Sequence, residues 1–200
     1  MLVTIANARI GVVRGLRYRV PMRVSIIAFC LTCLMSPAWA DQLDPSLPDL
    51  FEALRSGDGD VAALQFDIQA AWLRAPEAGI GILVNRTIQA LETEDVASAG
   101  VLTDHITGLA PHYAEGWMLK GHLALLGDDR VAAELAFGKV VSLEPRHFLA
   151  LEKLGDLALL SGDEERAHQR YREALDWNPH LGEVRERADR LRTALRGQEI

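Results

Sequence analysis

The feature that most constrains the fold is a repeat of 34 residues in the second half of the chain. Residues 114–147 and 148–181 align at this offset, and their small, aromatic and proline positions are retained. The matched pairs are Gly121 with Gly155, Ala124 with Ala158, Ala133 with Ala167, Phe137 with Tyr171, and Pro145 with Pro179. One repeat earlier in the sequence, residues 80–113 keep only some of these matched positions. Such a period is typical of solenoids, in which each repeat packs against its neighbours.

Each repeat has the pattern of two antiparallel helices. Apolar residues recur at helical spacing across 114–126, and a turn of Gly-Asp-Asp follows at 127–129. The second helix should end before Pro145, because proline cannot continue the hydrogen-bond ladder. Gly121 and Ala133 are small, which predicts that the two helices approach closely at these positions.

These residues resemble the tetratricopeptide-repeat (TPR) family, and the 148–181 unit matches its pattern most closely. The matching residues are Leu151, Leu154, Gly155, Gly162, Ala167, Tyr171, Ala174 and Pro179. The 114–147 unit departs from the pattern at Lys120, Ala124 and Val140. The chain also resembles exported TPR-repeat proteins of alphaproteobacteria. The resemblance implies an all-α solenoid of antiparallel, TPR-like helix pairs with about nine helices.

The sequence divides into six predicted segments. They are an export signal at 1–40, an atypical N-terminal helix pair at 41–79, a degenerate TPR at 80–113, two TPRs at 114–147 and 148–181, and a C-terminal capping helix and tail at 182–200. We expect the N-terminal pair to cap the stack, as atypical terminal repeats do. The arginines of the last segment are interleaved with acids, which favours a solvated, salt-bridged helix over a nucleic-acid surface.

The first 40 residues have the pattern of a cleaved signal peptide. Arg23 precedes a twelve-residue apolar run at 24–35, which is too short to span a bilayer comfortably. Ala38 and Ala40 then form an A-x-A cleavage site. An uncleaved anchor and an amphipathic leader are the alternatives, and translation starts at either Met1 or Met22. Both cysteines lie in the apolar run, so a disulfide or thiolate site is not expected in the mature chain.

The charge of the expected mature chain excludes one class of partner. Residues 41–200 hold 16 basic and 28 acidic residues, a net charge of −12. Nucleic-acid affinity comes largely from lysines and arginines that neutralise phosphates. We therefore expect no nucleic-acid binding, and no membrane binding after signal cleavage.

Patterns that indicate catalysis are scarce. The sequence has no Gly-rich phosphate loop, no His-Glu-x-x-His and no Gly-x-Ser-x-Gly. The six histidines are never spaced i,i+4, so no single helix presents two of them to a metal. His122 and Asp156 occupy the same position in successive repeats and could pair. A hydrolytic enzyme that uses them, or Glu152, is a remote alternative, and we predict no enzymatic activity, cofactor or metal.

The family's geometry implies a concave groove lined by the first helix of each repeat. The candidate partner-binding residues are Val84, Ile88, Leu91, Glu115, Met118, His122, Leu125, Leu149, Glu152, Asp156 and Leu159. This lining is apolar with acidic residues, which would suit a basic or amphipathic protein or peptide segment. Met118 and Glu152 stand where some family members use a lysine to grip a carboxylate. We therefore predict a periplasmic interaction module or adaptor, without that clamp. The alternative is a subunit or assembly helper of an envelope complex, which would use convex or terminal surfaces.

The signal pattern makes a direct prediction about the mature N-terminus. Mass spectrometry of the exported protein should find a chain that begins at Asp41, because cleavage follows Ala40. A mature form that keeps residues 24–40 would contradict this and indicate a membrane-tethered protein.

Overall fold

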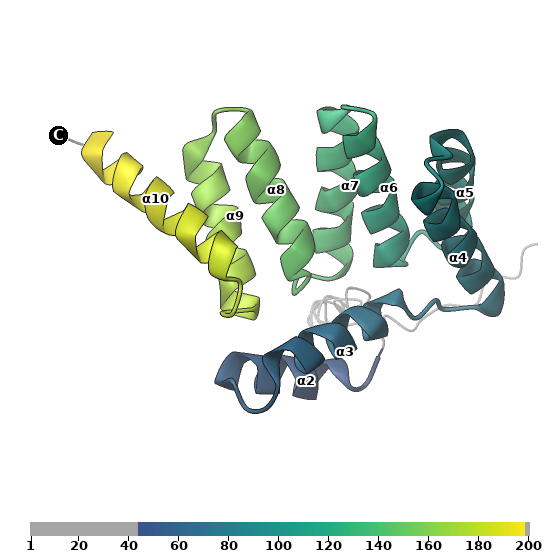
Figure 1. Ribbon diagram of the computed structural model, residues 1–200, viewed down its shortest axis with the longest axis horizontal. Coiled ribbons are helices and arrows are strands. Elements are labelled where there is room, and N and C mark those ends of the chain that lie inside the picture. The colour runs from purple at the N-terminus through teal and green to yellow at the C-terminus, as the bar shows by residue number, and fades with distance from the viewer. Residues whose placement is uncertain (1–43, 199–200) are drawn as a thin grey trace, which may run out of the picture. The chain divides into compact units, whose positions relative to one another are not determined.

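The computed structural model describes residues 44–198, and this part of the chain contains nine α-helices and no strand (Figure 1). The helices are α2 (Leu47–Ser56), α3 (Val61–Leu73), α4 (Ala78–Glu92), α5 (Val96–Leu109), α6 (Ala114–Leu126), α7 (Arg130–Leu143), α8 (Phe148–Leu160), α9 (Glu164–Trp177) and α10 (Gly182–Gln198). The predicted export signal and its cleavage site lie outside the described residues.

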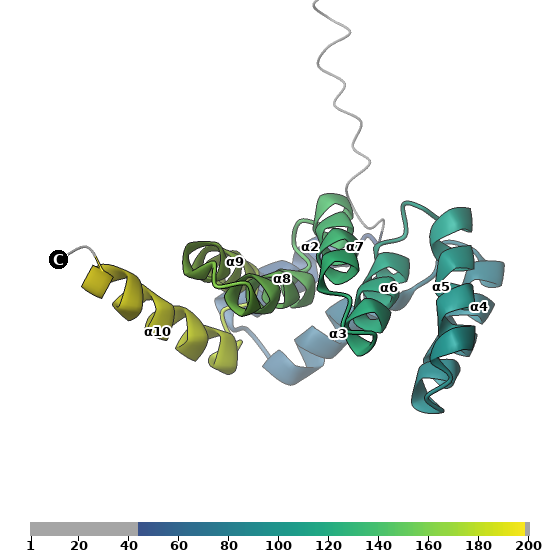
Figure 2. The ribbon, with the colours of Figure 1, turned by 90° about the horizontal axis from the view of Figure 1, so that it is seen from above.

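The predicted all-α arrangement of antiparallel helix pairs is confirmed. Helices α4 and α5, α6 and α7, and α8 and α9 form three successive pairs, and α10 packs on α9. Figure 2 shows α6 and α8 on one side of the stack and α7 and α9 on the other. We call α4, α6, α8 and α10 the first helices, because each occupies the first position of a repeat.

Aspartates begin the second helices of the pairs. The side chains of Asp95, Asp129 and Asp163 accept hydrogen bonds from the backbone N–H groups of the third residues of α5, α7 and α9, at 2.9–3.1 Å. Each cap satisfies a donor that has no partner within the helix. The turns therefore reverse the chain at the same place in every pair, which keeps the 34-residue register.

The close contacts inside the pairs are those that the small residues predict. Phe137 and Tyr171 are fully buried and pack on the glycines of the preceding helix. A Cβ atom added at Gly121 would lie 2.5 Å from Cε1 of Phe137, and one at Gly155 would lie 2.5 Å from Cε1 of Tyr171. Only glycine leaves room for the ring at these two positions.

The N-terminal pair is placed differently from our expectation. Helices α2 and α3 pack beside the ends of α6 to α9 instead of covering the end of the stack (Figure 1). The reason is aromatic packing. Phe51 of α2 contacts the rings of Phe148 and Trp177 at centroid distances of 6.4 and 5.9 Å, and Trp72 of α3 contacts Phe148 at 5.2 Å. These partners lie at the ends of α8 and α9, so the apolar stripes of α2 and α3 are buried there.

Two glycine-to-alanine substitutions test this packing with the same chemical change. Gly155→Ala should destabilise the protein by about 1–3 kcal/mol, because the Tyr171 ring is buried and cannot move away. Gly138→Ala should stabilise by up to about 1 kcal/mol through helix propensity, because a Cβ there meets no atom within 4 Å. Urea unfolding measures both. Equal free energies of unfolding for the two variants would mean that the helix-pair register is wrong.

Candidate functional site

The candidate binding residues lie on the first helices, on what we call the first-helix face. The structure buries Val84, Glu115 and Met118. It leaves Ile88, Leu91, His122, Leu125, Leu149, Glu152 and Asp156 partly exposed, and Leu159 is 39% exposed. Their contact with a partner stays a prediction. Several of them already have partners within the chain, and these contacts define which parts of the face are open.

Glu115 is engaged by His147, which lies at the junction between α7 and α8. The distance from His147 Nε2 to Glu115 Oε1 is 2.9 Å, and both side chains are almost completely buried. His147 Nδ1 accepts a hydrogen bond from the backbone N–H of Ala150 and so caps α8. Because Nδ1 is an acceptor, the hydrogen-bond network assigns the proton to Nε2, which donates to the carboxylate.

Trp72 of α3 covers this junction. Its ring stacks on the His147 ring with a centroid distance of 4.0 Å and an interplanar angle of 11°. The stack shields the hydrogen bond between His147 and Glu115 from water. Such a bond is electrostatically stronger in the protein interior than in water. His147 thus links α3, α6 and α8 through its contacts with Trp72, Glu115 and Ala150.

Three further contacts hold α2 and α3 along the same edge. His180 Nε2 donates to the carbonyl of Leu54 at 2.8 Å, and the Tyr113 hydroxyl donates to the carbonyl of Leu73 at 2.8 Å. Burial, followed by the charge of Glu115, raises the pKa of Tyr113, so its hydroxyl stays a donor. The Arg146 guanidinium lies 5.0 Å from the Phe51 ring centroid. The helix pair α2–α3 therefore closes the edge of the stack that carries the junctions before α6, α8 and α10.

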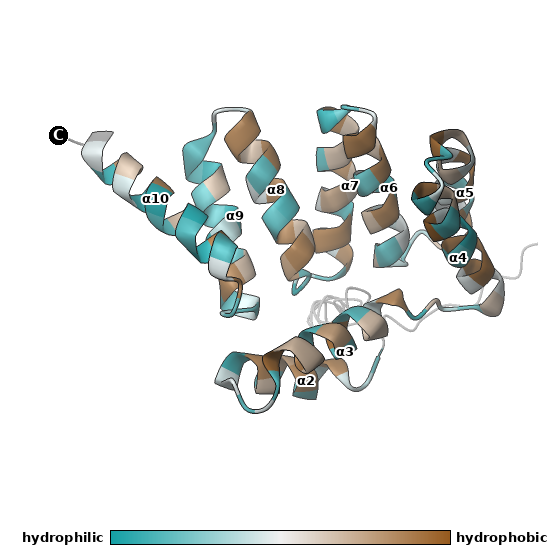
Figure 3. Cartoon of the chain, viewed as in Figure 1, coloured by the Kyte–Doolittle hydropathy of each residue, from teal (hydrophilic) through white to brown (hydrophobic). Residues whose placement is uncertain are grey.

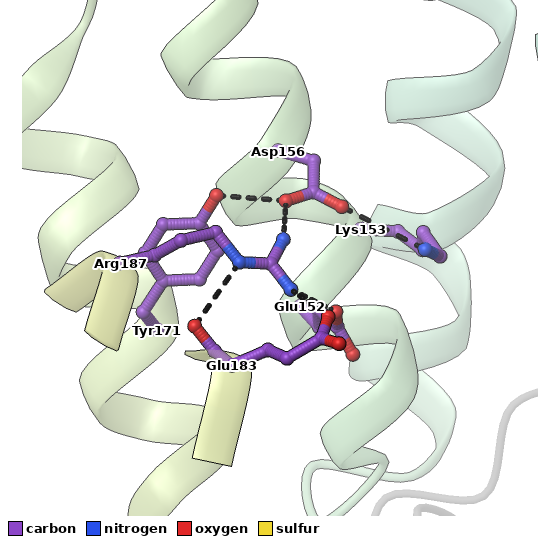
Figure 4. Close-up of polar contacts among 6 residues, drawn as sticks. All are labelled: Glu152, Lys153, Asp156, Tyr171, Glu183 and Arg187. Atoms are coloured by element: carbon purple, nitrogen blue, oxygen red, sulfur yellow. Dashed lines mark hydrogen bonds and ion pairs between the residues drawn. The ribbon is translucent and has the colours of Figure 1, made fainter. Parts of the chain in front are cut away.

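Glu152 and Asp156 of α8 are bound by an arginine of α10 (Figure 4). Arg187 Nη2 lies 2.7 Å from Glu152 Oε1, and Nη1 bonds Asp156 Oδ1. The Tyr171 hydroxyl donates to the same oxygen of Asp156 at 2.7 Å, and the guanidinium lies 5.3 Å from the Tyr171 ring centroid. Lys153 approaches the other oxygen of Asp156 at 3.6 Å.

The protonation states of this cluster follow from its contacts. Burial and the hydrogen bond to Asp156 raise the pKa of Tyr171, so the phenol remains a donor. Burial alone would lower the pKa of Arg187, but its bond to Glu152 and the charges of both carboxylates raise it. Arg187 therefore stays charged and fastens α10 to the first-helix face.

The structure does not bring His122 and Asp156 together as a catalytic pair. Asp156 is bonded to Tyr171 and Arg187, and the His122 ring lies edge-on to Phe137 at a centroid distance of 5.5 Å. Burial, and then the charge of Lys153, lowers the pKa of His122, so its imidazole is neutral at pH 7. Over residues 44–198, no group of three His, Cys, Asp or Glu side chains could hold a metal ion. None of the helices in this range combines the length and the apolar character that a membrane span requires.

The sequence analysis did not identify the residues that close the face. Trp72 was not singled out in the sequence, and Arg187 was only one of the arginines of the last segment that were expected to be solvated. The available signal was that His180 directly follows the repeat proline Pro179 and that His147 follows Pro145 one residue later. It marks both as junction residues, which the structure confirms.

The Arg187 cluster leads to a testable prediction. Arg187→Ala should lower the free energy of unfolding by about 1–2 kcal/mol, because two carboxylates lose their shared partner in a partly solvated site. Arg190→Ala is the matched control on the exposed side of the same helix, and it should change stability by less than about 0.5 kcal/mol. Urea unfolding compares the two, and equal effects would show that Arg187 does not fasten α10.

Comparisons with known proteins agree on the fold. No family model matches the sequence. The chain is 27% identical to a TPR repeat-containing protein of Rhizobium etli over 153 residues, which cover 76% of this chain and 75% of that protein.

Solved structures with the same architecture share little sequence with this chain. The first TPR of Spaghetti (RPAP3) bound to an HSP90 peptide has a TM-score of 0.54 at 15% identity and covers 58% of this chain and 92% of that one. MamA has a TM-score of 0.54 at 18% identity and covers 72% of this chain and 82% of its own. A third structure is the Yersinia enterocolitica type III secretion chaperone SycD in complex with a peptide of the translocator YopD. It has a TM-score of 0.51 at 11% identity, and the match covers 60% of this chain and 92% of SycD.

The predicted resemblance is thus confirmed: residues 44–198 have a TPR-like fold, and the chain is similar to a TPR repeat-containing protein of an alphaproteobacterium.

Proposed function

We propose that this protein is an exported, non-enzymatic interaction module that binds a segment of another protein on its first-helix face. After cleavage following Ala40, it would act in the periplasm. The signal pattern in residues 22–40 supports the location, and the solenoid fold supports a binding role, since solenoids present extended surfaces for partners.

One observation carries the proposal: the second helices cover only one side of the first helices. On the other side of α6 and α8, the side chains of His122, Leu125 and Leu159 reach solvent. The opposite end of α6 and α8 is closed by α2 and α3, and two carboxylates of α8 are bound to α10. The open part of the face therefore lies between elements that these contacts hold in place, and Leu125 and Leu159 in its lining keep surface that is exposed to solvent.

The similar structures support this role indirectly. RPAP3 holds an HSP90 peptide, and SycD holds a peptide of YopD. A protein segment is thus a ligand that this architecture accommodates. The separation of His122 from Asp156 argues against the hydrolytic alternative, because a base needs a partner within hydrogen-bond reach.

A specific observation also favours the convex surface as a second candidate. Val131 and Leu135 of α7 are each 72% exposed, and Val101 of α5 is 58% exposed. In α9 the positions equivalent to Val131 and Leu135 are Glu165 and Gln169, which are polar as expected for a solvent face. An apolar strip on the second helices would suit burial against a larger complex.

Site-specific photocrosslinking separates the two surfaces. A photoreactive residue is placed at Leu159 on the first-helix face, at Leu135 on the convex face, or at Gln169 as an exposed polar control. Met118 and Asp156 are unsuitable positions, because the first is buried and the second holds Arg187. A discrete adduct in the cell envelope from position 159 alone is the expected result. Adducts from position 135 and none from 159 would favour the complex-subunit alternative and contradict the proposal.

A further inference from the structure

Two pairs of leucines end the first helices of the two well-formed repeats. Leu125 and Leu126 end α6, and Leu159 and Leu160 end α8 at the same repeat positions. Leu126 is 66% exposed and Leu160 is 60% exposed, whereas Leu125 packs partly on the core. Figure 3 shows hydrophobic residues at these ends of α6 and α8. We call the four residues the leucine lip.

Packing inside the chain does not explain the leucine lip. Single exposed apolar residues are common on protein surfaces, but these recur as pairs in successive repeats. The equivalent positions of α10 are Thr193 and Ala194, so the fold does not need leucine there. The lip also lies at the opposite end of α6 and α8 from the edge that α2 and α3 close, and it remains open.

Acidic residues surround the leucine lip. The turns directly after the two leucine pairs contain Asp128, Asp129 and Asp163, and Glu164 and Glu165 begin α9. The arginines of these turns are already paired. Arg130 lies 3.4 Å from Asp128, and Arg166 lies 2.8 Å from Glu134 and 3.3 Å from Asp163.

The helix ends add negative potential at the lip. The C-terminal ends of α6 and α8 carry the negative ends of their helix dipoles. The surroundings therefore favour cationic groups beside the apolar contact.

We propose that the leucine lip docks a cationic amphipathic segment of the partner protein, with apolar side chains on the leucines and lysines or arginines beside the acidic turns. This inference rests on the proposed function and names the chemistry of the segment. It also moves the main contact from the middle of the first-helix face to its rim. The middle is largely engaged by the chain's own side chains, such as Arg187 on Glu152 and Asp156.

A second copy of the chain is a poorer occupant. The lip facing itself would bring like charges together, which is costly at an interface. The arginine-rich helix α10 has the right charge, but its apolar residues Val184, Ala188 and Leu191 are buried within its own chain. The charge complementarity therefore favours a separate, basic partner segment.

Peptide binding tests the proposal directly. The mature protein is titrated with three labelled 18-residue peptides: an amphipathic leucine–lysine helix, the same helix with glutamate for lysine, and a scrambled leucine–lysine sequence. Fluorescence anisotropy gives the Kd of each at 50 and 300 mM salt. We expect the amphipathic lysine peptide to bind at least ten-fold more tightly than the other two. Its affinity should fall at the higher salt concentration, because salt screens exposed charges.

Variants then locate the contact. L126Q/L160Q should weaken binding of the lysine peptide at least ten-fold. F66Q/L109Q is the matched control, because Phe66 of α3 and Leu109 of α5 are similarly exposed, at 71% and 70%, and lie outside both candidate surfaces, and it should bind like the parent. Unchanged thermal midpoints show that both variants are folded. Equal affinity for the lysine and glutamate peptides, or parental binding by L126Q/L160Q, would overturn the proposal.

The outcome is separable from that of the proposed function. A crosslinked partner in the cell envelope together with parental peptide binding by L126Q/L160Q would refute the cationic contact at the lip and leave the interaction module standing. Lip-dependent binding of the lysine peptide with no crosslinked protein at position 159, which is itself a lip residue, would support the chemistry of the lip and count against a partner in the envelope.

Discussion

The packing of an aromatic ring on a glycine is the contact on which the rest of the structure depends. Phe137 on Gly121 and Tyr171 on Gly155 fix the distance between the two helices of each repeat. Tyr171 also connects this packing to α10. Its hydroxyl donates a hydrogen bond to Asp156, and Asp156 is bonded to Arg187 of α10. A residue without a side chain thus determines where the C-terminal helix is fastened. In an array in which each unit contacts only its neighbours, such a contact has few others to compensate for it.

The junction at His147, between α7 and α8, has a comparable role for the N-terminal helix pair. It joins the cap of α8, the carboxylate of α6 and the stacked Trp72 of α3 in one buried site. Because α2 and α3 are held there, they close one edge of the stack instead of lengthening it. The surface available to a partner is consequently the open part of the first-helix face and its far rim, where the leucines and acidic turns lie.

Much of the fold could be predicted from the sequence because its determinants are local or periodic. The 34-residue offset marked Gly121 and Gly155 as positions of close helix contact and gave the bounds of α6 without any tertiary information, whereas the structure supplied the aromatic rings that pack there. The position of α2 and α3 could not be predicted in this way. It depends on contacts such as Trp72 with His147 and Leu54 with His180, between residues far apart in the sequence that share no period.

In the candidate site, too, the periodic features could be predicted from the sequence and the long-range contacts could not. Repeat position indicates that Glu115, Glu152 and Asp156 belong to the first-helix face, but it does not indicate that His147 and Arg187 already bind them. Those partners come from a junction and from the terminal helix, where the family pattern assigns no side chain. Leu126 and Leu160 were missed because their exposure, unlike their spacing, is a tertiary property.

The central claim is that α2 and α3 are an integral part of the fold and permanently close one edge of the stack. Residue-resolved hydrogen exchange of the mature protein tests it most directly, because exchange measures the free energy of local opening. The account predicts that core amides of α2 and α3, such as those of Leu54 and Trp72, exchange as slowly as those of α8. Exchange of α2 and α3 several orders of magnitude faster than that of α8 would contradict it. Such a result would mean that the edge opens independently of the repeats.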